Sequence, residues 1–188
     1  SEMCIRDSFN MHMVFSGNPG TGKTTVARLI KDIFYNLGYI AQNKLTEVTA
    51  KDLVGEYLGQ TSGKTYNVVK SAVGGVLFID EAYAITDGED AGNKYGNECV
   101  ATLLKLMEDY KNKLIIIFAG YDNKMENFLK SNPGLISRIG YKIKFPDYTL
   151  DELIQIYLKL LEKNNLKIDD EAIEKLKEII TVASKQED

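Results

Sequence analysis

The chain has 188 residues, of which 44% are hydrophobic and 27% charged, values typical of a globular protein with one sizeable core. Its formal net charge of −4 disfavours a nonspecific grip on nucleic acid, and no basic run is present. No apolar stretch approaches membrane-spanning length, and no signal peptide is visible. The two cysteines, Cys4 and Cys99, match no metal-ligand spacing, so we expect free thiols in a cytoplasmic protein.

Strands and helices are expected to alternate along most of the chain, which predicts an α/β fold with a parallel sheet between helices. The expected strands cover residues 11–16, 44–49, 76–80, 113–118 and 141–145. The expected helices cover 22–37, 61–72, 95–110 and 124–130, and the last of them ends before residues 132–134. The lone histidine, His12, lies on the first strand and is expected to pack there, since no second histidine is present to share a metal.

After Pro146 the pattern becomes purely helical. A capping box of Thr149 and Glu152 starts one helix, expected to end near Lys163, and Asp169 caps a second. Two helices are few for an independent domain, so we expect part of a small helical lid. The predicted organisation is an unstructured or foreign leader at 1–9, a large α/β domain at 10–147 and the partial lid at 148–188.

Residues 17–24 read GNPGTGKT, the complete phosphate-binding loop pattern G-x-x-x-x-G-K-[ST], set between an apolar strand and a helix. Glycines let backbone N–H groups turn toward phosphate oxygens, and the following helix points its positive end at them. Lys23 is expected to reach the β- and γ-phosphates, and the Thr24 hydroxyl to coordinate Mg²⁺. The expected nucleotide-binding residues are Gly17, Asn18, Pro19, Gly20, Thr21, Gly22, Lys23, Thr24 and Thr25.

Residues 76–81 read VLFIDE, a buried-strand pattern that ends in two acids. Ligands of open α/β sheets bind at the carboxyl ends of parallel strands. Asp80 is expected to hold Mg²⁺ through water, and Glu81 to orient or deprotonate an attacking water. The guanine-reading N-K-x-D element fails at both 43–46 and 122–125, and small-molecule kinases need no glutamate beside the metal aspartate. The tandem acids therefore favour ATP hydrolysis.

Arginine is scarce, since only Arg6, Arg28 and Arg138 stand against twenty lysines. In such a chain a retained arginine suggests a need for its planar, delocalised charge. Arg138 comes just before the last strand, and we expect it on the ATP-side rim of the sheet. There it could serve as an arginine finger. The alternative is an ordinary surface arginine, and Arg28 is expected to be structural.

The triplet Tyr57-Leu58-Gly59 lies between the second strand and the next helix, flanked by further polar and glycine residues. An aromatic–aliphatic–glycine triplet on a flexible loop can grip an extended polypeptide without reading its sequence, because tyrosine offers apolar area and a polar tip. The alternative is a loop aromatic packed onto the core.

Together these motifs resemble the AAA+ ATPases, and within them the CbxX/CfqX family. The similar stretches cover residues 17–28, 52–59, 74–83, 119–121 and 131–139, and the likeness runs from about Asn10 to the end of the chain. Several independent motifs occur in the family's order, which makes the likeness specific. It implies a P-loop AAA+ fold, with a five-stranded parallel sheet between helices as the nucleotide-binding domain and a helical lid beside it.

The resemblance also implies a quaternary structure and a mechanism. ATP with Mg²⁺ would bind between the subunits of a ring, usually a homohexamer, with Arg138 acting in trans and residues 57–59 lining a pore that pulls on a protein substrate. The chain departs from the wider family in two places. Tyr121 stands at the sensor position, with Asp122 and Asn123 as undecided substitutes, and no arginine follows Arg138. We therefore expect a chain truncated in the lid and upstream of the first strand.

The expected function is ATP hydrolysis that drives chaperone-like remodelling or threading of a protein. Two alternatives remain open. One is a nucleotide-dependent assembly module with little turnover, which the missing lid arginine favours. The other is a DNA-acting AAA+ ATPase, which the acidic balance disfavours. The substrate stays open among Rubisco, a sporulation protein and a secretion cargo, and no membrane partner is expected.

Overall fold

The computed structural model describes residues 10–57, 59–87, 94–164, 166 and 169–184. The chain divides into two compact units between Phe145 and Pro146, close to the predicted domain boundary. The predicted leader, residues 1–9, lies outside the described residues. Over the part of the chain that is described, no helix is long and apolar enough to cross a membrane.

The first unit is built on a sheet of five strands in the order β2-β3-β4-β1-β5. The strands are β1 (Met13–Ser16), β2 (Leu45–Thr49), β3 (Val76–Asp80), β4 (Ile115–Gly120) and β5 (Tyr141–Lys144). All neighbouring strands are parallel, which confirms the predicted five-stranded parallel sheet. Every strand therefore has its carboxyl end at the same edge, the edge at which Ser16 and Asp80 lie.

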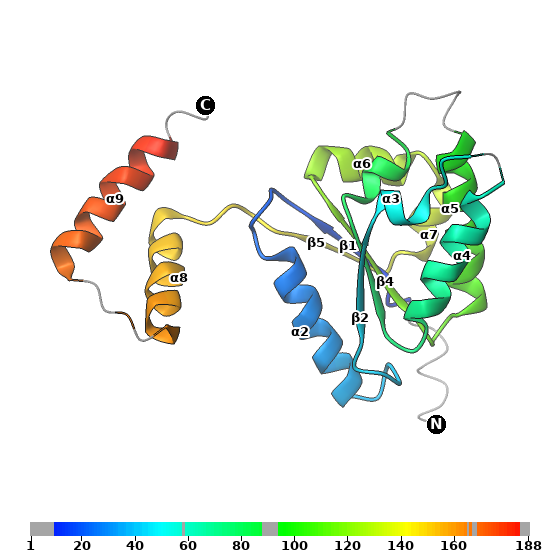
Figure 1. The fold of residues 1–188 in the computed structure, drawn as a ribbon, viewed down its shortest axis with the longest axis horizontal. Helices are drawn as coiled ribbons and strands as arrows, with labels where there is room; N and C mark the ends of the chain where they lie inside the picture. Colours follow the sequence, from blue (N-terminus) through cyan, green and yellow to red (C-terminus); the bar gives the residue numbers. More distant parts are fainter. Residues whose placement is uncertain (1–9, 58, 88–93, 165, 167–168, 185–188) are drawn as a thin grey trace. The chain divides into compact units, whose positions relative to one another are not determined.

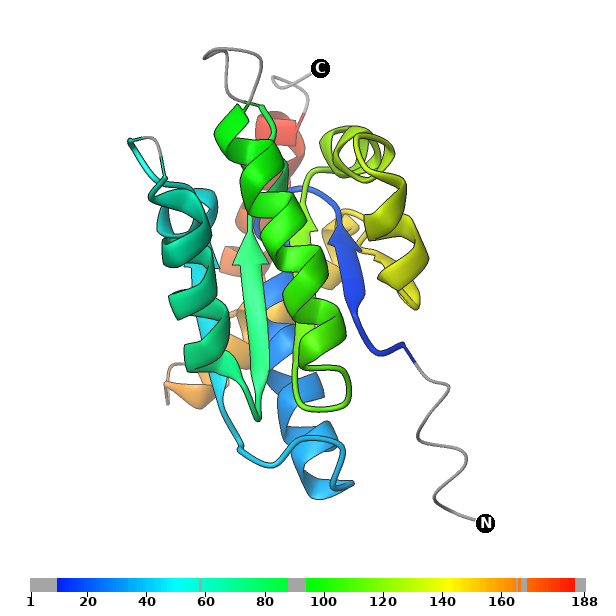
Figure 2. The same cartoon turned by 90° about the vertical axis from the view of Figure 1, so that its right-hand side faces the viewer.

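Helices cover both faces of this sheet. They are α2 (Lys23–Asn36), α3 (Ala50–Leu53), α4 (Thr61–Ala72), the 3-10 helix η1 (Ala82–Ile85), α5 (Lys94–Asp109), α6 (Asp122–Lys130) and α7 (Pro133–Arg138). Helix α2 lies on one face and α4 and α5 on the other (Figure 1), and Figure 2 shows the sheet from the side of α4 and α5. This arrangement confirms the predicted α/β class.

A separate core lies on each face of the sheet, and β3 contributes to both. Phe78 packs on the α2 side, where Ala27 is also buried. Leu77 and Ile79 belong to the larger core that α4, α5 and α6 complete on the other face. Each of residues 76–79 is at most 1% exposed, which explains why this strand is a continuous apolar run rather than an alternating one.

Three short helices, α3, α7 and η1, lie where the sequence analysis predicts no helix. Helix α7 begins at the predicted turn: Asn132 Oδ1 accepts the Gly134 N–H at 2.9 Å, and Pro133 occupies the first helical position. Helix α3 follows a capping box in which the Thr49 N–H donates to Asp52 Oδ2 at 2.8 Å. Helix α6 ends at Lys130, before residues 132–134 as expected, but the start of α7 at these residues was not predicted, because asparagine and proline favour turns as well as helix starts.

Within the described residues, the second unit consists of α8 (Leu150–Lys163) and α9 (Asp170–Ser184), which pack on each other. The predicted capping box is present: the Thr149 N–H donates to Glu152 Oε2 at 2.8 Å, and Thr149 Oγ1 accepts the Glu152 N–H at 3.3 Å. Asp169 Oδ1 accepts the Ala172 N–H at 2.8 Å, which confirms the second cap.

Candidate nucleotide site

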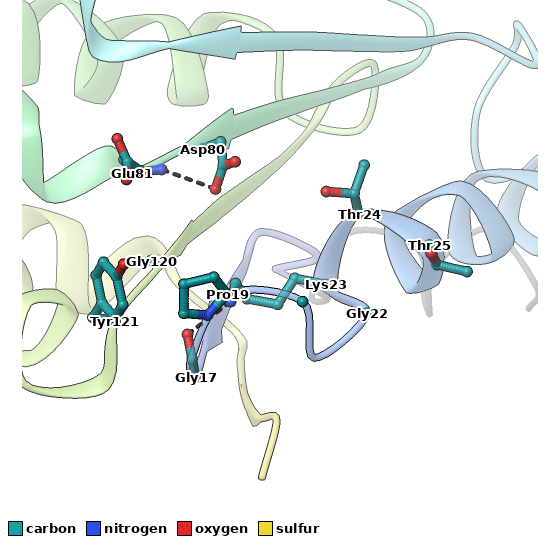
Figure 3. Close-up of a pocket in the computed structure, with 11 residues that line it drawn as sticks. Gly17, Pro19, Gly22, Lys23, Thr24, Thr25, Asp80, Glu81, Gly120 and Tyr121 are labelled. Atoms are coloured by element: carbon teal, nitrogen blue, oxygen red, sulfur yellow. Dashed lines mark hydrogen bonds between the residues drawn. The ribbon is translucent and has the colours of Figure 1, made fainter. Parts of the chain in front are cut away.

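A cavity of about 320 Å³ opens at the carboxyl edge of the sheet, where β1, β3 and β4 end (Figure 3). Its walls come from the loop after β1, the first turn of α2, and the residues that close β3 and β4. The lining residues are Gly17, Pro19, Gly20, Gly22, Lys23, Thr24, Thr25, Asp80, Glu81, Gly120 and Tyr121. The phosphate-loop motif and the tandem acids, far apart in the sequence, thus share one cavity.

The loop between β1 and α2 has the backbone of a phosphate cradle. Gly20 and Gly22 adopt φ angles of +75° and +93°, in the left-handed region that residues with a side chain rarely enter. Residues in the left-handed region that alternate with residues of negative φ turn successive backbone N–H groups toward one concavity, and such a concavity binds anions. Lys23 Nζ donates to the carbonyl oxygens of Gly17 and Asn18, both at 2.7 Å, so its ammonium group is anchored on the loop itself.

Thr24 and Asp80 supply the groups expected to hold a metal ion. The Thr24 hydroxyl, on the first turn of α2, and the Asp80 carboxylate, at the end of β3, face the same space (Figure 3). Mg²⁺ favours such oxygen ligands and completes its shell with water and substrate phosphates. No group of three or more His, Cys, Asp or Glu side chains in the described ranges could hold an ion alone. The donor set therefore fits Mg²⁺ that arrives with a nucleotide.

Glu81 combines an unusual backbone with an exposed side chain. Its φ of +48° and ψ of +43° lie in the left-handed region, a strain that concentrates at functional sites. The Glu81 N–H donates to Asp80 Oδ1 at 3.0 Å, and Glu81 Oε1 accepts the Tyr83 hydroxyl at 3.2 Å. An exposed carboxylate beside the metal-side acid is suited to take a proton from water.

The residues that close β4 complete the cavity wall. Tyr121, the predicted sensor, caps α6 and lies with its ring 5.9 Å from that of Tyr83. Asp122, one of its undecided substitutes, pairs with Lys144 at 2.8 Å, and this hydrogen bond is the main reason that the pKa of Asp122 is lowered. Gly120 is absent from the predicted site residues. Its position at the carboxyl end of a buried strand is the signal that could have indicated it.

Arg138 lies at the opposite edge of the sheet. It precedes β5, whose first residue, Tyr141, is in register with Met13 at the amino end of β1. It lines a second cavity of about 280 Å³ together with His12 and Glu108. Arg138 Nη2 lies 3.8 Å from Glu108 Oε2, and its Nε has no hydrogen-bond partner among the described residues. The predicted place on the ATP-side rim is wrong, because a residue before a parallel strand lies at the edge opposite to residues that follow one.

His12 is a packed residue and Cys99 a free thiol, as the sequence predicts. His12 is 6% exposed, and its Nδ1 accepts the Ile116 N–H at 3.0 Å. Burial, and then the charge of Arg138, lower the pKa of His12 to about 4, so the ring is neutral at neutral pH. Cys99 is a buried free thiol whose pKa is raised by burial to about 11. Cys4 lies outside the described residues.

The loop between α3 and α4 presents Tyr57 to solvent. Tyr57 is 67% exposed, so the alternative of an aromatic packed onto the core is wrong. Gly59 has a φ of +81°, and Leu58 lies outside the described residues. The base of the loop is fixed, because the Gly55 N–H donates to the fully buried Thr61 Oγ1 at 3.0 Å. An exposed aromatic on an anchored loop is suited to contact a partner.

A phosphate-binding loop and two acids at the carboxyl edge of a parallel sheet define a P-loop nucleotide-binding protein. The model of one protein family, the ATPase family associated with various cellular activities (AAA), matches residues 13–147. The chain belongs to this family.

The chain is also similar to curated proteins of the CfxQ and CbxX type, which confirms the resemblance found in its motifs. It is 50% identical over 170 residues to the CfxQ homolog of Galdieria sulphuraria, over 90% of this chain and 55% of that protein. It is 51% identical over 162 residues to the chloroplastic ribulose bisphosphate carboxylase/oxygenase activase of Cyanidioschyzon merolae, over 86% and 55%. It is 45% identical over 175 residues to stage V sporulation protein K of Bacillus subtilis, over 93% and 54%. The chain spans about half the length of these relatives.

One solved structure with a similar fold is the crystal structure of the FIGL-1 AAA domain in complex with ADP. The TM-score is 0.62 at 17% identity, over 91% of this chain and 55% of that one. At this identity the likeness supports the fold alone, and it agrees with the sheet and helices described above.

Proposed function

We propose that this protein binds ATP together with Mg²⁺ and hydrolyses the ATP. The observation that carries the proposal is the meeting of the phosphate loop with Asp80 and Glu81 in one cavity. Lys23 binds the β- and γ-phosphates, and Thr24 and Asp80 hold Mg²⁺, which would neutralise charge on the phosphate oxygens. Glu81 orients the attacking water and accepts its proton.

We further propose that the site is shared between subunits of a ring, a homohexamer by family likeness, and that Arg138 acts on the neighbour's ATP. Support comes from its location at the amino edge of the sheet, opposite the chain's own cavity at the carboxyl edge. A guanidinium that meets charge developing on the γ-phosphate stabilises the transition state, and this is the role of an arginine finger.

The work that ATP drives is proposed to be remodelling of a protein, threaded through the pore of the ring. Support comes from the exposure of Tyr57 on an anchored loop and from the relatives, one of which is named as a Rubisco activase. The acidic net charge argues against a DNA substrate.

The test of hydrolysis is ATP turnover by the wild-type chain and by Glu81→Gln. We expect Glu81→Gln to keep ATP affinity and to lower kcat by about 10²- to 10⁴-fold, the range for a lost general base. Glu126→Gln, at an exposed glutamate paired with Lys130 on α6, is the matched control and should turn over like wild type. Equal rates for wild type and Glu81→Gln would refute the role of Glu81.

Two other outcomes point to the alternative functions. Tight ATP binding with no turnover in wild type, together with nucleotide-dependent association in sedimentation, indicates an assembly module. A gain in turnover on adding DNA that weakens steeply with salt indicates a DNA-acting ATPase.

A further inference from the structure

Tyr83, a buried residue, brings its hydroxyl to the carboxylate of Glu81, and no motif gives it a role. It lies in η1, the 3-10 turn that follows β3, and is 6% exposed. Its hydroxyl donates to Glu81 Oε1 at 3.2 Å. Glu81 itself is exposed at the wall of the nucleotide cavity. The phenol therefore extends from the core to the acid that we propose activates water.

The ring of Tyr83 is enclosed by three neighbours. Gly120 leaves room for it, since a Cβ at this position would lie 2.7 Å from Tyr83 Cδ1. The Tyr121 ring lies 5.9 Å away, centroid to centroid, and Lys124 Nζ lies 4.5 Å from the Tyr83 centroid. Because these neighbours fix the orientation of the ring, the Tyr83 hydroxyl has one direction in which to donate. The side chain therefore loses little conformational entropy when it hydrogen-bonds to Glu81.

The Tyr83 hydroxyl stays protonated at neutral pH and therefore remains a hydrogen-bond donor. Burial, and then the charge of Glu81, raise the pKa of Tyr83 to about 12. A neutral phenol donates one hydrogen bond, and here that bond goes to the carboxylate. The left-handed backbone at Glu81 constrains the acid from its other end.

We propose that Tyr83 is a positioning residue for Glu81, an inference that rests on the proposed function of Glu81 as proton acceptor. The hydroxyl holds Oε1, and Oε2 is left to accept the proton. The water oxygen forms its bond to the γ-phosphorus as the bond from that phosphorus to the ADP oxygen breaks, and the water proton passes to Glu81. Tyr83 keeps its own proton and acts only by fixing the orientation of the carboxylate.

The test is ATP turnover by Tyr83→Phe, which removes the hydroxyl and keeps the ring. Loss of a hydrogen bond to a charged group is expected to lower kcat about tenfold, while KM for ATP stays within about twofold. Tyr35→Phe, at an exposed tyrosine near the end of α2, is the matched control and should change neither constant. Thermal unfolding of both variants verifies that each is folded at the assay temperature.

The Glu81→Gln background separates this inference from the proposed function. There Tyr83→Phe is expected to have no further effect on kcat, because the phenol acts only through the carboxylate. The same tenfold loss in both backgrounds, or turnover by Tyr83→Phe at or above the wild-type rate, would overturn the positioning role and leave the proposed function standing. A wild-type chain no faster than Glu81→Gln would overturn the proposed function and this inference with it.

Discussion

The two edges of the sheet in the first unit differ in how their charged and titratable side chains are exposed. At the carboxyl edge, Lys23, Asp80 and Glu81 line an open cavity of about 320 Å³. At the amino edge, His12 is buried and neutral, and Arg138 pairs with a glutamate while its side chain stays 34% exposed. The first edge presents its charges to the chain's own cavity, and at the second Arg138 lies half-buried beside Glu108, outside that cavity.

The difference between the two edges gives a reason why one copy of the chain would need a second copy to complete its nucleotide site. A parallel sheet sends residues that follow strands to one edge and residues that precede strands to the other. Arg138 is therefore kept from the chain's own cavity by the fold, whatever its side chain does. On the proposed function each chain carries half of two sites, and the predictions below test that division.

Among the variants that test the division between the two edges, the largest effect is expected from Arg138→Ala. Loss of an arginine finger should lower kcat about 10³-fold and leave ATP affinity within about twofold, because the group acts on the transition state. Turnover assays and calorimetry measure the two quantities. Arg28→Ala removes an exposed arginine that pairs with Glu47 at 2.8 Å and is the control, expected to turn over like wild type.

A mixture of two inactive variants decides whether the finger acts across subunits. Lys23→Ala keeps Arg138 but has lost its own site, and Arg138→Ala keeps its site but has lost the finger. Mixed rings should regain turnover at interfaces where an intact site meets an intact finger. Failure of the mixture to exceed either variant alone would argue against action in trans.

The next effect is on binding and comes from the carboxyl edge. Lys23→Ala removes the charge that holds the β- and γ-phosphates, and ATP affinity should fall about 100-fold or more. Calorimetric titration with ATP checks this, with Lys130→Ala, an exposed lysine of α6, as the control. Wild-type affinity in Lys23→Ala would mean that the loop does not bind phosphate.

The burial of His12 at the amino edge predicts that the stability of the folded protein depends on pH. The pKa of His12 is about 4 in the folded protein and 6.5 unperturbed, so the unfolded chain takes up a proton first as pH falls. The stability that depends on neutral His12 is complete above about pH 6.5 and is lost progressively toward pH 4, by about 2 kcal/mol at pH 5. Denaturant unfolding of wild type and His12→Gln measures this. Parallel pH curves for the two proteins would contradict it.

The smallest effect on ATP turnover is expected at the pore loop. Tyr57→Ala should leave basal ATPase within about twofold, because the side chain is 67% exposed and does not line the nucleotide cavity, yet it should stop remodelling of a protein. ATP-dependent loss of fluorescence from a destabilised fluorescent protein is the readout, and Tyr57→Phe, which keeps the ring, is the control. Unchanged remodelling by Tyr57→Ala would remove Tyr57 from the pore.

Much of the fold and of the cavity can be predicted because the signals are local. Residues 17–24 and 76–81 each carry their whole motif in one short stretch, and the continuous apolar run of β3 marks a strand buried on both faces. Short helices are harder. The start of α7 at Asn132 and Pro133 uses the same residues as a turn, and only the contacts of the folded chain decide between the two.

The sequence by itself indicated the ligand class and the acids of the site, since each depends on a motif within a few residues, and it predicted the parallel sheet from the alternation of strands and helices along the chain. The tertiary structure corrected the edge assigned to Arg138 through the register of β5 beside β1, although a place before a parallel strand already implies the amino edge. It also decided that a buried tyrosine reaches Glu81, because the space for Tyr83 is made by Gly120 at the end of another strand. Contacts between distant segments depend on strand order and packing, and no local pattern encodes them.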